Sequence, residues 1–196
     1  RVASTGVLAT ESKYHTFLSK RFDRRDDGKR IHFASAMTLL GLMDGANAGT
    51  GNGYLDIVDF MIQGCTNVEV NLQELYRRVA FNICVGNTDD HFRNHGFLLT
   101  PKGWTLSPAY DMNPTLNEQQ SLLISSSSCE SDLTILLDAC EDYMLSKDMA
   151  VKIISEVVDT MKGWRQLAMR LQISKREIDL FAHRFDRYSS FVFSAV

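Results

Sequence analysis

The sequence lacks several features that define membrane, secreted or zinc-thiolate proteins. No apolar run approaches the ~20 residues of a membrane span, and the N-terminus has no signal-peptide pattern. The four cysteines, Cys65, Cys84, Cys129 and Cys140, form no C-x-x-C pair and have no zinc-ligand spacing. Cys84 and Cys140 fall in apolar helical patterns, which indicates buried thiols in the reducing environment of the cytoplasm.

Strong charge of either sign is also missing. The formal net charge is −3, so neither direct nucleic-acid binding nor a membrane partner is expected. With 196 residues, of which 44% are hydrophobic, the chain can form one domain with a real core. It begins RVASTG rather than with methionine, which suggests a fragment, a processed chain or a start inside a longer protein.

The spacing of apolar residues predicts a mainly α (α+β) fold. The clearest helix covers 72–85, with an N-cap expected at Asn71, while its polar residues, Arg78 and Asn82 among them, lie mostly off the apolar stripe. Ser174 and Glu177 form a capping box before the last helix. The other helices are expected at 31–42, 54–62, 133–145, 148–171 with a break at Gly163, and 178–192. Strands are expected at 15–22, 95–100 and 104–108.

The stretch VGNTDDHFRNHG, from Val85 to Gly96, gathers polar chemistry directly after the clearest helix. Asp89 and Asn94 are five positions apart, and Asp111 follows the expected hairpin in SPAYDMNP. Carboxylate and amide oxygens are ligands that magnesium prefers. Phosphoryl transfer needs one carboxylate to orient the attacking hydroxyl and others to hold the metal. This order of residues is typical of a protein-kinase catalytic loop.

Three motifs together, FLSKRFDR, GNTDDHFRNHGFLL and GWTLSPAYDMNP, resemble the C-terminal domain of the HipA family. These are bacterial serine/threonine kinases, many of them toxins of toxin–antitoxin pairs. The D-D-H-x-x-N core is also similar to the loop of the phosphatidylinositol 3-kinase-like group. The resemblance is strong over 17–114 and weaker through LSKDMAVKIISEV. It implies a kinase C-lobe over 1–196, a helical body with a small β-hairpin, a hinge strand at 15–24, and the catalytic helix, loop and metal-binding hairpin at 71–114.

The resemblance also assigns roles in the loop and the hairpin. Asp89 matches the catalytic aspartate that receives the proton of the substrate hydroxyl, and His91 matches a residue that organises the loop. Asn94 and Asp111 match the magnesium ligands. The implied reaction transfers the γ-phosphate of ATP, with Mg²⁺, to a hydroxyl of a protein substrate, and a HipB-like antitoxin is the implied partner.

The hinge supplies the nucleotide-binding residues by the same resemblance. Backbone groups of Lys20 to Asp23 would bind adenine, with Phe22 against the base and Asp23 near the ribose. The family places its nucleotide-binding lysine and a phosphate-covering loop in an N-lobe before the hinge, and RVASTGVLATESKYH is too short to contain that lobe. Either the N-lobe lies upstream in the native gene, or another chain supplies it, or the activity has been lost.

Two other functions stay open from the residues alone. A metal-dependent phosphohydrolase would use Asp89, Asp90, His91 and His95 to hold two metals and activate water. A kinase remnant that binds a partner without catalysis is the other alternative. In the kinase interpretation Asp90 is expected to be solvated.

Overall fold

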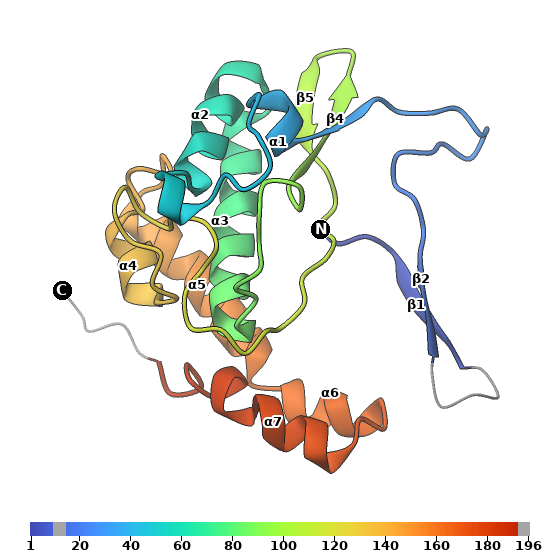
Figure 1. Ribbon diagram of the computed structural model, residues 1–196, viewed down its shortest axis with the longest axis vertical. Coiled ribbons are helices and arrows are strands. Elements are labelled where there is room, and N and C mark those ends of the chain that lie inside the picture. Colours follow the sequence, from blue (N-terminus) through green and yellow to red (C-terminus); the bar gives the residue numbers. More distant parts are fainter. Residues whose placement is uncertain (10–14, 192–196) are drawn as a thin grey trace.

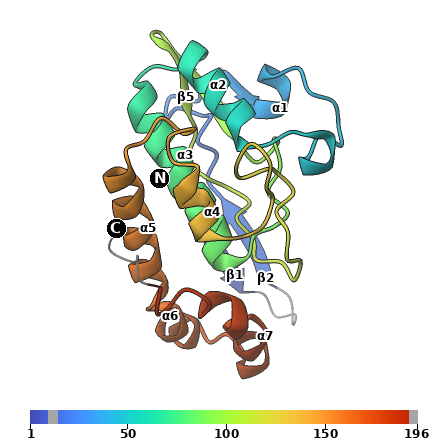
Figure 2. The same ribbon diagram turned by 90° about the vertical axis from the view of Figure 1, so that its left-hand side faces the viewer.

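The computed structural model describes residues 1–9 and 15–191 and is organised around one long helix, α3 (Val68–Val85). Four helices pack against α3: α2 (Tyr54–Gly64), α4 (Leu133–Asp138), α5 (Lys147–Met161) and α7 (Lys175–Phe185). In Figures 1 and 2, α3 runs through the middle of this body, with α2 at one end and α7 at the other. No helix in the described part of the chain is long and apolar enough to cross a membrane.

A three-stranded antiparallel sheet lies beside α2 and α3. Its order is β3 (Phe33–Ser35), β4 (Gly96–Thr100) and β5 (Gly103–Leu106), with Phe97 opposite both Ala34 and Leu106. The expected hairpin of β4 and β5 is therefore confirmed. The helix expected at 31–42 is wrong for most of its length, because the backbone at 33–35 pairs with β4 and leaves only α1 (Ala36–Leu39) helical.

A second hairpin, formed by β1 (Thr5–Ala9) and β2 (His15–Ser19), extends away from the helical body in Figure 1. The expected strand at 15–22 ends at Ser19, and β1 was not expected. Among the described residues of this hairpin, four large apolar side chains are exposed: Val7, Leu8, Phe17 and Leu18. The chain before β1 is joined to the body by a parallel bridge between Val2 and Ala109.

The start of α3 differs from the sequence expectation. The helix begins at Val68, so Asn71 lies inside it rather than at its N-cap. The buried Asn71 side chain donates to the carbonyl of Thr66 and accepts a 2.9 Å hydrogen bond from the backbone N–H of Leu106. Asn71 therefore joins α3 to β5, a tertiary role that a capping pattern does not indicate.

In the C-terminal half, the helix break and the capping box lie at the predicted residues, whereas two helices end earlier than predicted. Gly163 separates α5 from α6 (Trp164–Arg170), and the capping box of Ser174 and Glu177 begins α7, as expected. The last helix ends at Phe185 instead of reaching 192, a position outside the described residues. The helix expected at 133–145 ends at Asp138, and a 3₁₀ helix, η1 (Ala48–Thr50), precedes α2.

Candidate active site

The polar loop begins where α3 ends, at Gly86. Gly86 has φ +68°, a left-handed conformation that glycine adopts without strain, and it forms the C-cap of α3. Two residues later, the carbonyl of Thr88 accepts hydrogen bonds from both the backbone N–H (2.9 Å) and the hydroxyl (2.8 Å) of Ser121. The Thr88 hydroxyl contacts that of Thr115 at 2.5 Å. The first part of the loop is thus fixed to the segment that follows the sheet.

Asp90 is the centre of the buried part of the loop. Its side chain is only 3% exposed, and its Oδ2 accepts hydrogen bonds from the Tyr54 hydroxyl (2.7 Å), Asn82 Nδ2 (2.8 Å) and His95 Nε2 (2.8 Å). Burial acts to raise the pKa of Asp90. The charge of His95, together with the hydrogen bonds from His95 and Tyr54, outweighs burial and holds this pKa below its ordinary value. The expectation of a solvated Asp90 was therefore wrong, because three buried donors satisfy this carboxylate.

Asp89, the neighbouring carboxylate, has the opposite environment. It is exposed and makes no side-chain hydrogen bond within the described part of the chain, although Thr88 and Asp90 on either side are buried and anchored. His91 also makes no side-chain hydrogen bond there, and its Nδ1 is buried without a partner. The buried side-chain hydrogen bond within the loop joins Asp90 to His95, whereas the backbone carbonyl of His91 accepts a 2.8 Å hydrogen bond from the N–H of Asn94.

Asn94 and Asp111 lie on two segments that are joined directly. Asn94 is 8% exposed, and among the described residues its side-chain amide has no hydrogen-bond partner. Asp111 is exposed, has φ +57°, and accepts a 2.7 Å hydrogen bond from Asn113 Nδ2. The hydroxyl of Tyr110 donates to the backbone carbonyl of Arg93 at 2.6 Å, so the residues next to Asp111 and Asn94 are in contact.

The hinge residues lie together in one pocket of about 440 Å³, large enough for part of a nucleotide. It is lined by Ser19, Lys20, Arg21, Phe22, Asp23, Phe33, Arg93 and Tyr110. A second pocket, of about 610 Å³, contains Asp111 and shares Ser19 and Tyr110 with the first. The structure therefore brings Lys20, Phe22 and Asp23 together and places Asp111 in the adjoining pocket. Asp89, His91 and Asn94 line neither pocket.

All three nucleotide-binding candidates already have protein contacts. The backbone N–H of Lys20 donates to the carbonyl of Ser4 at 2.8 Å, and its ammonium lies 3.8 Å from Asp26. The ring of Phe22 packs against Phe33 and Tyr110, with centroid distances of 5.8 and 5.7 Å. The Asp23 carboxylate accepts two hydrogen bonds from Arg21, at 2.8 and 2.6 Å, and one from Arg24 at 2.6 Å. The hydrogen bonds from Arg21 are the largest cause that lowers the pKa of Asp23 to about 2.

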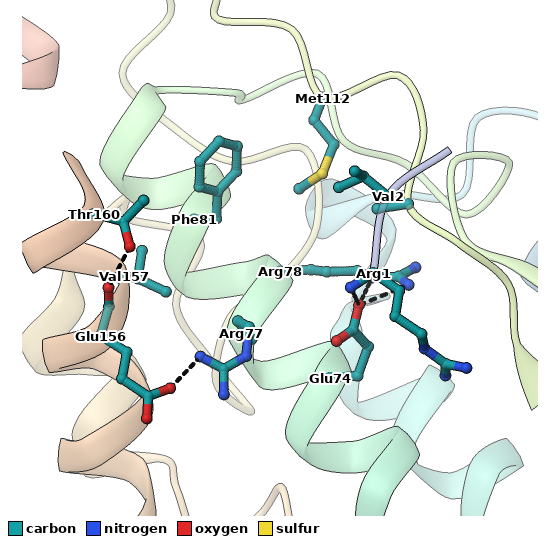
Figure 3. Close-up of a pocket in the computed structure, with 11 residues that line it drawn as sticks. Arg1, Val2, Glu74, Arg77, Arg78, Phe81, Met112, Glu156, Val157 and Thr160 are labelled. Carbon is teal, nitrogen blue, oxygen red and sulfur yellow. Dashed lines mark hydrogen bonds and ion pairs between the residues drawn. The ribbon is translucent and has the colours of Figure 1, made fainter. Parts of the chain in front are cut away.

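Arg78 of α3 holds the segment before Asp111 through a hydrogen bond. The sequence interpretation did not indicate this role. This buried residue of α3 donates to Glu74 Oε1 at 3.0 Å and to the carbonyl of Ser107 at 2.5 Å. Arg78, Glu74 and Met112 line a pocket of about 350 Å³ between α3 and α5, and Figure 3 shows Arg78 between the other two. A polar residue on a helix gives no sign of burial by itself, so only the packing of 107–112 reveals the role of Arg78.

Clustered metal ligands are absent from the part of the chain that the structure describes. No three His, Cys, Asp or Glu side chains there lie close enough to share a metal ion. Asp90 and His95 are hydrogen-bonded to each other inside the fold. The Asp/His centre of a two-metal phosphohydrolase is therefore not formed by these residues.

Comparison with known proteins agrees with the motifs. The model of the family "HipA-like C-terminal domain" matches residues 1–165. The serine/threonine-protein kinase toxin HipA of Shewanella oneidensis is 31% identical over 117 residues, which cover 51% of this chain and 27% of that protein. A putative kinase of Haemophilus influenzae is 29% identical over 105 residues, which cover 50% of this chain and 31% of that protein.

The fold is also similar to a solved structure. The complex of Shewanella oneidensis HipA, HipB and operator DNA contains a chain that matches with a TM-score of 0.78 at 18% identity. The match covers 96% of this chain and 50% of that chain. The curated relatives are matched over less than a third of their length. Because the family model matches most of the sequence, this chain belongs to the HipA-like C-terminal domain family.

Proposed function

We propose that this chain is the catalytic lobe of an ATP-dependent serine/threonine protein kinase that transfers the γ-phosphate to a protein hydroxyl. Family membership and kinase-named relatives support this proposal. The observation that carries it is the contrast between the adjacent carboxylates of the loop. Asp90 is buried and satisfied by three donors, whereas Asp89 is exposed and has no protein partner in the described chain.

Asp89 is the proposed catalytic residue. In phosphoryl transfer the protein supplies mainly positioning and charge, and one carboxylate orients the attacking hydroxyl and accepts its proton. A carboxylate used by other protein groups would be less available for this role. The anchored neighbours of Asp89 hold its backbone in place while its side chain stays open to a substrate.

Asn94 and Asp111 are the proposed magnesium ligands. The residues fit this role, because the side-chain amide of Asn94 has no described protein partner and Asp111 presents an exposed carboxylate. Magnesium in kinases takes one or two protein ligands and completes its shell with water and phosphate oxygens, so a dense carboxylate cluster is not required. When bound, the ion offsets the negative charge of the phosphates. The bond from Tyr110 to Arg93 supports the proposed convergence of the two ligands.

The hinge pocket is the proposed nucleotide site. Its volume of about 440 Å³ and its aromatic wall suit a purine, with Phe22 against the base and backbone groups of Lys20 to Asp23 as hydrogen-bonding partners. For Asp23 to meet the ribose, Arg21 has to release one carboxylate oxygen. The Arg21 side chain is 66% exposed, so this exchange costs little.

A kinase N-lobe is proposed to pack on the β1–β2 hairpin. A two-stranded hairpin is marginally stable alone in water, and this one exposes apolar side chains such as Val7 and Phe17. An N-lobe at this position would bring the nucleotide-binding lysine toward the hinge. We also propose a cytoplasmic setting and an antitoxin partner of the HipB type. The structural relative is a complex of HipA with HipB and operator DNA.

The test uses the full-length protein that contains this domain. Replacing Asp89 by asparagine should lower transfer of radiolabelled γ-phosphate by about 10²-fold or more, the range for loss of a general base. The melting temperature should not change, because the Asp89 side chain makes no described hydrogen bond. Asp142→Asn, at another exposed aspartate, is the matched control. Full activity of Asp89→Asn would show that the catalytic assignment is wrong.

A further inference from the structure

We infer that Asp90 is a positioning residue for phosphoryl transfer, because its bond to His95 closes the loop directly behind Asp89 and Asn94. The inference rests on the proposed kinase function. It assigns Asp90 no contact with substrate, nucleotide or metal. Its role is to set the separation and direction of the two residues that make those contacts.

Two pairs of residues in the loop have the same spacing. Asp89 and Asn94 are five positions apart, and Asp90 and His95 repeat that spacing one residue later. Each member of the second pair is covalently bonded to a member of the first. The second pair is joined by a 2.8 Å hydrogen bond between His95 Nε2 and Asp90 Oδ2. Fixing the second pair therefore restrains the first.

The same oxygen ties the loop to the rigid body. Tyr54 reaches Asp90 from α2, Asn82 reaches it from the last turns of α3, and His95 immediately precedes β4. All four side chains are buried. One carboxylate oxygen thus connects two helices and the sheet at the point where the loop crosses between them.

Charge on Asp90 strengthens this arrangement. All three groups around Oδ2 are donors, so the oxygen must act as an acceptor, and bonds to a carboxylate are roughly twice as strong as bonds between neutral groups. The bond to Asp90 also places the shared proton on His95 Nε2. His95 Nδ1 is buried without a partner in the described chain, so the bond to Asp90 is the one side-chain hydrogen bond there that holds the His95 ring.

The first test separates positioning from binding in the full-length enzyme. Asp90→Asn keeps the size of the side chain but removes its charge, and the loosened loop should lower kcat by about 10- to 100-fold, as small misplacements of catalytic groups do. The KM for ATP should change by less than about threefold, because Asp90 does not line the hinge pocket. Asp59→Asn, at an exposed position of α2, is the matched control and should leave both constants unchanged.

The second test does not depend on activity. Histidine-selective ¹⁵N NMR of the wild-type protein should show His95 with its proton on Nε2, slow to exchange with solvent. A His95→Gln variant assigns the signal. In Asp90→Asn this proton should exchange faster, while the signals of the other histidines keep their positions. A wild-type His95 with its proton only on Nδ1 would overturn the inference.

The outcomes distinguish this inference from the proposed function. Loss of activity in Asp89→Asn together with wild-type kcat in a folded Asp90→Asn would refute the positioning role and leave the kinase proposal standing. If Asp89→Asn is fully active, both fail. If Asp90→Asn does not fold, Tyr54→Phe replaces it, since this variant removes one donor and keeps the carboxylate. A several-fold fall in its kcat at unchanged KM supports the inference, and an unchanged kcat refutes it.

Discussion

The Tyr110 hydroxyl donates a 2.6 Å hydrogen bond to the backbone carbonyl of Arg93. Tyr110 precedes Asp111 and Arg93 precedes Asn94, so this one bond connects the segments of both proposed magnesium ligands. It also fixes the aromatic ring that lines both the hinge pocket and the pocket of Asp111. Neither sequence motif alone indicates this connection.

Tyr110→Phe should therefore weaken the binding of magnesium–nucleotide as well as the fold. Loss of one hydrogen bond of this kind should lower the free energy of unfolding by about 1 kcal/mol, measured by urea denaturation. Isothermal titration of the full-length protein with ATP and Mg²⁺ should show a several-fold rise in Kd.

The matched control is Tyr188→Phe, which removes a 3.1 Å bond from a tyrosine hydroxyl to the carbonyl of Ser131. It should cost a similar free energy of unfolding and leave the nucleotide Kd unchanged. Equal effects of the two variants on Kd would contradict a specific role for Tyr110.

The pairing of Asp23 with Arg21 should be visible as a titration. The pKa of Asp23 is lowered from 3.8 to about 2, chiefly by the hydrogen bonds from Arg21. A lowered pKa means that the pairing stabilises the fold above pH ~4 and that this stabilisation is lost as the pH falls toward 2. In Arg21→Ala the ¹³C NMR midpoint of the Asp23 carboxyl should rise toward its ordinary value.

The stability difference between the wild-type protein and Arg21→Ala should shrink over the same acidic range. Lys29→Ala removes a basic residue of the same turn, which is 3.7 Å from Asp27, and it should leave the Asp23 midpoint in place. An Asp23 midpoint that does not respond to Arg21→Ala would show that the pair does not form in solution.

Gly86→Ala should destabilise the end of α3. An added Cβ would lie 2.5 Å from Cδ of Arg184, and the residue has φ +68°. These two effects together should lower the free energy of unfolding by about 1–3 kcal/mol in chemical denaturation. Gly163→Ala is the control, because its Cβ would meet nothing closer than 3.9 Å at a negative φ. A stability loss that is equal at both positions would contradict the predicted strain at Gly86.

The Cys84 thiol should be unreactive in the folded protein. Cys84 is buried, and burial raises its pKa to about 12, so little thiolate forms at neutral pH. Mass spectrometry after a short treatment with iodoacetamide should find Cys84 unmodified, and modified once the protein is unfolded in urea. The partly exposed Cys129 should be modified first. Rapid modification of Cys84 without unfolding would show that the core around α3 opens.

The sequence determined the local features of this protein. The apolar period of α3, the glycine that ends it, the break at Gly163 and the capping box of Ser174 are all encoded within a few neighbouring residues, and the structure confirms each of them. The ordered motifs were likewise sufficient to identify the family, which the family model confirms.

Tertiary structure decided the burial of polar residues and the pairing of distant segments. Asp89 and Asp90 are identical in type and adjacent, so no local pattern distinguishes the exposed carboxylate from the buried one. Asp90 is the buried carboxylate because donors 36 and 8 positions away, on Tyr54 and Asn82, bind it. The short strand β3 shows the same dependence, because residues with helical spacing pair with β4 once its edge is available. Burial and strand pairing depend on contacts between residues that are far apart in the sequence, and these residues meet only when the chain folds.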